Sequence, residues 1–114
     1  MTEIEHVDVL IVGAGLSGIG AACQLKTGHP DRSIAILEAR EASGGTWDLF
    51  RYPGIRSDSD MFTFGYRWRP WPSDTALADG ELILDYVRTV AEEHDVDKLI
   101  RYRYQVTAAD WDSE

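Results

Sequence analysis

Two short apolar runs near the N-terminus form the first clear pattern of the chain, at residues 7–12 (VDVLIV) and 33–37 (SIAIL). Nearly continuous runs of β-branched and apolar residues are typical of strands that are buried on both faces of a parallel sheet. The segment between them, at 19–26, is rich in helix-forming residues and is followed by a glycine and a proline, which end helices. The pattern predicts a βαβ unit of about thirty residues that ends at Glu38.

The C-terminal third is predicted to hold a helix and a strand. Residues 81–94 carry apolar side chains at helical spacing, and Asp79 precedes them in the position of a cap. The expected apolar face consists of Leu82, Ile83, Tyr86, Val87, Val90 and Ala91. Alternation at 100–106 predicts a third parallel strand with this helix as its crossover, and residues 107–111 resemble the start of another strand. The fold class that follows is α/β, a parallel sheet with crossover helices.

Residues 39–80 connect these two parts and have no clean period, although they hold three of the four prolines and three of the four tryptophans. A connection this long inside a compact domain is usually functional or mobile. Its segment GGTWDLFRYPG, at 44–54, is too irregular for a helix and too aromatic for a solvated loop. We therefore expect it to contact a flat, partly apolar group.

Composition narrows the class of protein. The chain has 114 residues and a formal net charge of −9, which argues against a nucleic-acid or anionic-membrane binder because phosphates are bound by clustered Lys and Arg. The single cysteine, Cys23, forms no internal disulfide and is expected to be a buried, inert thiol. The N-terminus does not resemble a signal peptide, no apolar run approaches a membrane span, and the histidines lack metal-ligand spacing. These features favour a cytoplasmic location.

The glycines of Gly13-x-Gly15-x-x-Gly18 lie between the first predicted strand and the first predicted helix, where such a motif binds the pyrophosphate of a dinucleotide. Gly13 allows the tight turn, Gly15 lets the phosphates approach the backbone, and Gly18 lets the helix pack against the strand. The phosphates would lie at the positive end of the helix dipole, where Ser17 adds a hydroxyl donor. The alternative is that these are ordinary turn glycines.

Glu38 strengthens the dinucleotide interpretation. It lies twenty residues after Gly18, at the end of the second predicted strand, where a carboxylate accepts hydrogen bonds from the ribose hydroxyls of an adenosine. The same carboxylate repels a 2′-phosphate, so the site is expected to hold FAD or NAD and not NADP. The fingerprint does not decide between FAD and NAD, and the alternative for Glu38 is a solvated strand end.

The residues after the fingerprint resemble a known family. Glu38-Ala39-Arg40 followed by Gly44-Gly45 has the spacing of two-dinucleotide flavoproteins of the glutathione-reductase type, in which the glycine pair passes close to the phosphates of the flavin cofactor. GAGLSG, ILEAR and GGTWDLFRYPGIRSDSDMFTFGYRWRPW together resemble the N-terminal FAD-binding segment of class B flavin monooxygenases, in particular the Baeyer–Villiger type and its ethionamide-activating members. A fragment of an NAD-dependent dehydrogenase would not explain the GGTW stretch.

The resemblance implies a partial doubly wound, Rossmann-like FAD/NAD(P)-binding domain in which the 44–54 segment faces the flavin. In this family NADPH reduces the flavin, which captures O₂ and passes a peroxide oxygen to a ketone, a sulfide or a thioamide. Fingerprint and resemblance together assign to FAD the residues Gly13, Gly15, Ser17, Gly18, Glu38, Arg40, Gly45, Thr46, Trp47, Asp48, Leu49, Asp58 and Val106. They assign to NADP(H) the residues Arg56, Ser57 and Asp58, and they place no catalytic residue in this segment.

Two of these residue assignments have plain structural alternatives. Trp47 can be a packing residue, and Arg56 with Asp58 can be a structural ion pair. We expect residues 1–114 to be the N-terminal part of an FAD-binding domain, because the chain has no second Gly-x-Gly-x-x-Gly for NADPH and no Phe-x-Gly-x-x-x-His motif of this family. The chain alone is then expected to be inactive. The alternative function is a stand-alone, non-catalytic module that binds FAD or NAD.

Overall fold

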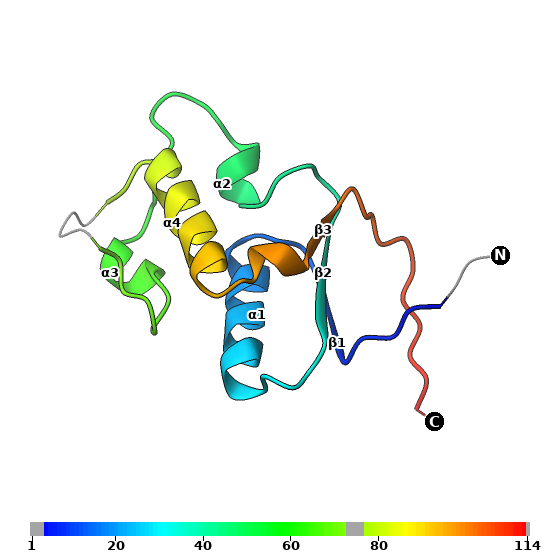
Figure 1. The fold of residues 1–114 in the computed structure, drawn as a ribbon. Coiled ribbons are helices and arrows are strands. Elements are labelled where there is room, and N and C mark those ends of the chain that lie inside the picture. The colour runs from blue at the N-terminus through cyan, green and yellow to red at the C-terminus, as the bar shows by residue number, and fades with distance from the viewer. Residues whose placement is uncertain (1–3, 73–76, 114) are drawn as a thin grey trace.

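The computed structural model describes residues 4–72 and 77–113, arranged as a three-stranded parallel sheet with helices packed against it (Figure 1). In chain order the elements are β1 (Val9–Val12), α1 (Leu16–Gly28), β2 (Ile34–Glu38), α2 (Thr46–Leu49), α3 (Met61–Phe64), α4 (Gly80–Glu93), a 3₁₀ turn at Asp97–Leu99 and β3 (Ile100–Tyr102). The strand order is β1-β2-β3, with Val9 opposite Ile34 and Ile36 opposite Ile100. The predicted α/β class, the βαβ unit and the parallel third strand are confirmed.

The core lies between the sheet and the two long helices. Figure 1 shows α1 and α4 side by side on one side of the sheet, and the residues that they bury there belong to one cluster with β2. Ile19, Ile36, Val87 and Val90 have no solvent-exposed surface. Cys23 is also buried in this cluster, and burial raises the pKa of its thiol to about 11, so the thiol stays protonated and unreactive at neutral pH, as predicted.

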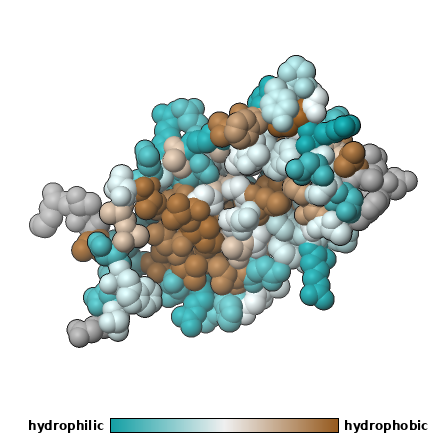
Figure 2. Space-filling view, turned by 180° about the vertical axis from the view of Figure 1, so that it is seen from behind, coloured by the Kyte–Doolittle hydropathy of each residue, from teal (hydrophilic) through white to brown (hydrophobic). Residues whose placement is uncertain are grey.

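The opposite face of the sheet is open at β1. Leu10 is 53% exposed and Val12 is 65% exposed, because successive side chains of β1 point to opposite faces and no helix of residues 4–72 or 77–113 covers this one. Figure 2 shows the apolar side chains gathered on this side of the molecule. The prediction that β1 is buried on both faces is therefore wrong, whereas β2 is buried along most of its length, with Ala35, the residue opposite Leu10, only 3% exposed.

Helix α4 begins after Asp79, which is at the predicted N-cap position but makes no side-chain capping hydrogen bond. Its predicted apolar face is shifted slightly. Leu82 is 54% exposed, whereas Leu84, which the prediction omitted, is 4% exposed. The buried stripe is centred on Ile83, Val87 and Val90, and Leu82 lies outside it on the helix surface.

The third strand is shorter than predicted. β3 ends at Tyr102, because Arg103 has a backbone φ of 62° that is incompatible with an extended strand. The backbone N–H groups of Arg103 and Tyr104 still donate to the carbonyls of Arg40 and Glu38, but the described residues beyond them form no regular element. The predicted continuation to residue 106 and the predicted strand start at 107–111 are wrong.

The 39–80 connection is irregular, as predicted, apart from two helices of four residues, α2 and α3. Its aromatic residues pack on one another and on α4. The Tyr66 ring stacks on Trp68 and on Tyr86, with ring centroids 4.7 Å and 5.8 Å apart, and Trp71 lies 5.2 Å from Tyr86. These side chains hold the connection against α4.

Within the described ranges, no helix has the length and apolar character that a membrane span requires.

Candidate functional site

The turn between β1 and α1 has the geometry that the glycine fingerprint predicts. Gly13 has a φ of 100°, a conformation that glycine adopts without strain, and its N–H donates to the carbonyl of Leu37 over 2.8 Å. A Cβ placed on Gly18 would lie 1.9 Å from the carbonyl oxygen of Gly13. A side chain at position 18 is thus sterically excluded, which accounts for the close packing of α1 against the turn.

The N-terminus of α1 is open for an anion. Its N-cap is Gly15, which has no side chain to bind the first N–H groups, and the first turn contains no acidic residue. These N–H groups lack partners within the helix, and the helix dipole places partial positive charge beside them. Ser17 lies exposed in this first turn. The arrangement is suited to a phosphate or pyrophosphate group.

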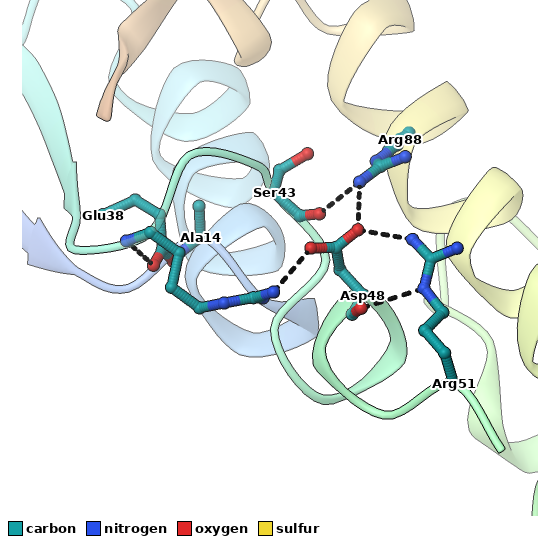
Figure 3. Close-up of polar contacts among 7 residues, drawn as sticks. Ala14, Glu38, Ser43, Asp48, Arg51 and Arg88 are labelled. Atoms are coloured by element: carbon teal, nitrogen blue, oxygen red, sulfur yellow. Dashed lines mark hydrogen bonds and ion pairs between the residues drawn. The ribbon is translucent and has the colours of Figure 1, made fainter. Parts of the chain in front are cut away.

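Glu38 is held in a defined position at the end of β2. The residue is only 7% exposed, and its two carboxylate oxygens accept the backbone N–H groups of Ala14 over 2.9 Å and of Arg40 over 3.0 Å (Figure 3). The alternative of a solvated strand end is therefore excluded. A carboxylate has about four acceptor sites, so about two remain for further donors such as ribose hydroxyls.

The glycine pair of the 44–54 segment meets the fingerprint turn. Gly44 has a φ of 116° and its N–H donates to the carbonyl of Ala14 over 2.9 Å. A Cβ on Gly45 would lie 3.1 Å from Cα of Gly15, so the two loops touch through bare backbone. Both loops line one cavity of about 430 Å³, whose walls are Val12, Gly13, Gly15, Leu16, Ser17, Gly18, Gly44, Gly45, Thr46, Trp47 and Phe64.

A second cavity of about 460 Å³ shares Thr46 and Trp47 with the first. It brings Arg56 and Asp58 next to aromatic surface, and its lining residues are Thr46, Trp47, Phe50, Tyr52, Ile55, Arg56 and Asp58. In the described part of the chain no ion pair joins Arg56 to Asp58, so the structural ion-pair alternative has no support.

Trp47 is half-buried between the two cavities. Its ring packs edge-on against Phe64, with ring centroids 6.0 Å apart. Trp47 can therefore be a packing residue and a cofactor contact at the same time. Its ring packs against Phe64, and its side chain still lines both cavities.

Six predicted residues line neither cavity, and two of them, Glu38 and Arg40, lie at and just after the end of β2. Ser57 is buried, and its hydroxyl accepts the N–H of Ala78 over 3.2 Å. Leu49 is 53% exposed, and Val106 is in the irregular segment after β3. Asp48 is turned toward arginines.

The carboxylate of Asp48 is surrounded by three arginines from different parts of the chain (Figure 3). One oxygen lies 2.6 Å from Arg51 and 2.8 Å from Arg88, and the other lies 2.9 Å from Arg40. Burial alone would raise the pKa of Asp48, but the hydrogen bonds from Arg51 and Arg88 and the charge of Arg40 together hold it below its usual value. The sequence gives no local signal for this cluster, because Arg88 is forty residues away.

The site has the features of a Rossmann-type dinucleotide-binding site. These are a parallel sheet, a glycine turn that leads into an open helix N-terminus, and a buried carboxylate at the end of the second strand. The sequence model of the NAD(P)-binding Rossmann-like domain family matches residues 11–76. The chain belongs to this family.

Among residues 4–72 and 77–113 no cluster of three or more potential metal ligands is found.

Curated relatives confirm the resemblance to flavin monooxygenases. The chain is 59% identical over 109 residues to MymA of Mycobacterium tuberculosis, and 58% identical over 107 residues to the FAD-containing monooxygenase EthA of the same species. These alignments cover 96% and 94% of this chain and 22% of each relative. The chain thus spans about a fifth of the length of the relatives that it matches.

Solved structures of monooxygenases share the fold. The structure of OTEMO in complex with FAD and NADP superimposes with a TM-score of 0.82 at 32% identity, covering 96% of this chain and 21% of that one. An oxidized steroid monooxygenase bound to NADP gives a TM-score of 0.76 at 29% identity, covering 85% of this chain and 19% of that one. The Rossmann-like fold class predicted from the sequence is confirmed.

Proposed function

We propose that this chain is the FAD-binding part of an NADPH- and O₂-dependent flavin monooxygenase, with residues 1–114 as the N-terminal portion of its FAD domain. The observation that carries the proposal is the open cavity that two glycine loops, 13–18 and 44–47, line together, next to the turn that the buried Glu38 holds through Ala14. Two similar proteins support FAD as the cofactor. EthA is named as an FAD-containing monooxygenase, and the structure of OTEMO is a complex with FAD and NADP.

The residues present fit FAD. A Cβ at Gly18 or Gly45 would crowd the cradle, and the first turn of α1 offers free N–H donors for a pyrophosphate. Arg40 has a buried guanidinium nitrogen, Nη1, without a hydrogen-bond partner in the described chain, so it can donate to the cofactor. Glu38 would accept the ribose hydroxyls, and Ser17 would donate to a phosphate. Val106 would hold the adenine through its backbone.

The flavin end would lie along Thr46 and Trp47, at the junction of the two cavities. A bound flavin supplies the reduction of O₂ and the transfer of one oxygen atom, while this segment orients the ring and excludes water from it. Arg56 and Asp58 would face the nicotinamide end of NADP(H), with Ser57 contributing only through its backbone. For Asp48 and Leu49 we propose contact through the backbone, since the Asp48 carboxylate is already paired.

The proposed substrates are small organic ketones, sulfides or thioamides, and the proposed location is the cytoplasm. A second candidate is a non-catalytic module that binds FAD or NAD. It is favoured by the family description, which names NAD(P).

The activity test compares two proteins, this chain and a full-length reading frame that contains it. We expect the 114-residue chain, supplied with FAD, not to couple NADPH oxidation to the formation of a sulfoxide, because the isoalloxazine pocket of this family is completed by other segments. The longer protein is expected to couple them, measured as NADPH consumption and product by mass spectrometry. A longer protein that holds FAD but oxygenates no ketone, sulfide or thioamide would support the non-catalytic module instead.

A further inference from the structure

The segment Ser43 to Leu49 carries the glycine pair and both residues shared by the two cavities, and its main apolar contact with the core is made by Trp47. None of the four residues of α2 is fully buried, and Gly44 and Gly45 both have positive φ. Ordering a glycine-rich backbone costs about 1–2 kcal/mol per residue in conformational entropy. A cofactor that has to order this segment when it binds would lose affinity accordingly.

Arg88 of α4 holds this segment at two points. A single guanidinium nitrogen, Nη2, donates to the carbonyl oxygen of Ser43 over 2.8 Å and to the carboxylate of Asp48 over 2.8 Å (Figure 3). The first contact precedes the glycine pair and the second lies within α2. Because α4 is part of the core, Arg88 connects the loop directly to the rigid body of the fold.

The other two arginines complete the anchor from the loop side. Arg40 pairs with the second oxygen of Asp48, and Arg51 binds both the carboxylate and the backbone carbonyl of Asp48. The four side chains carry a formal charge of three minus one, or +2, in a chain whose formal net charge is −9. This local excess of positive charge complements a pyrophosphate group at long range.

Arg88 itself lines neither of the two cavities that hold the predicted cofactor residues. The fingerprint turn and Glu38 have hydrogen bonds of their own, between Gly13 and Leu37 and between Glu38 and Ala14, which do not involve Arg88. The segment that Arg88 fixes contains Thr46 and Trp47, which are proposed to face the flavin, while its glycine pair adjoins the fingerprint turn.

We propose that Arg88 is a positioning residue that pre-orders the segment Ser43 to Leu49, through Asp48 and the Ser43 carbonyl, for the flavin half of FAD. This inference rests on the proposed FAD-binding function. It has a specific consequence: removal of Arg88 weakens the binding of FAD by a larger factor than the binding of ADP, which lacks the flavin half and meets this segment only at the glycine pair. A role in general stability would weaken both ligands equally.

The test measures dissociation constants for FAD and for ADP on the purified chain by titration calorimetry. Arg88→Met, which keeps the aliphatic stem and removes every donor, is expected to raise the Kd for FAD roughly tenfold to a hundredfold and the Kd for ADP by a clearly smaller factor. Arg88→Lys is expected to restore most of the FAD affinity, because one ammonium can donate to both oxygens that Nη2 binds. The matched control is Arg32→Met, which removes an exposed arginine paired with Asp8.

A second variant and a second readout cover a failure of Arg88→Met to fold. Asp48→Asn removes the central charge and is expected to give the same selective loss of FAD affinity. Faster amide hydrogen exchange in residues 43–50 of either variant, with unchanged exchange in β1 and α1, is the expected accompanying result. Equal loss of FAD and ADP affinity, or no loss of either, overturns the positioning role. If the unaltered chain binds neither ligand, the proposed function itself fails and this inference fails with it.

Discussion

Gly18→Ala is expected to lower the free energy of unfolding of the chain by about 3 kcal/mol or more. The added Cβ would lie 1.9 Å from the carbonyl oxygen of Gly13 and 3.0 Å from its carbonyl carbon. Both obstructing atoms belong to the backbone, so the strain cannot be relieved by a change of side-chain rotamer. Either α1 moves away from β1 or the fingerprint turn opens, and each movement also disrupts the phosphate cradle.

Urea unfolding followed by circular dichroism measures this effect, and Gly28→Ala is the matched control. Gly28 is the last residue of α1, and a Cβ there meets nothing within 4 Å. Its replacement is expected to leave the stability unchanged or to increase it by about 0.5 kcal/mol. If the two variants unfold at the same urea concentration, the turn does not have the close packing described here.

Glu38→Ala is expected to weaken FAD binding roughly a hundredfold, the largest effect on affinity that we predict. The variant removes the proposed acceptor for the ribose hydroxyls and also the carboxylate that binds the backbone N–H groups of Ala14 and Arg40. Two buried or half-buried N–H groups lose their partner, so the free energy of unfolding should also fall, by about 1–3 kcal/mol.

Flavin fluorescence at a temperature at which the variant is folded separates these two effects. Glu41→Gln is the matched control, since the Glu41 side chain is 74% exposed and pairs only with the equally exposed Arg103. It should bind FAD like the unaltered chain. An unchanged dissociation constant for FAD in Glu38→Ala would mean that the ribose lies elsewhere.

The local patterns of the sequence were sufficient for the βαβ unit and for the fingerprint turn. The turn needs Gly13 and Gly18 for steric reasons that act over a few residues, and Glu38 follows from the length of the helix and strand between them. Errors occurred where tertiary contacts or backbone torsion decide the outcome. The alternation at 100–106 continues past the point at which Arg103 turns the chain away.

The arginine cluster could not be predicted from the sequence. Asp48 was assigned to the cofactor from the resemblance, but its partners Arg40 and Arg88 come from the end of β2 and from α4, and no sequence spacing relates them. The open face of β1 was missed for a related reason. An apolar strand predicts that both faces avoid water, but tertiary contacts outside the strand decide whether its second face is covered.

The most direct test of the central claim is a titration of the purified chain with FAD, read by flavin fluorescence, beside an identical titration with riboflavin. The two ligands share the flavin ring, and only FAD carries the pyrophosphate and adenosine that the glycine loops and Glu38 are proposed to hold. We predict saturable, one-to-one binding of FAD and no binding of riboflavin at the same concentrations. Failure of a folded chain to bind FAD, or equal binding of the two ligands, would contradict the assignment of this cavity as a dinucleotide site.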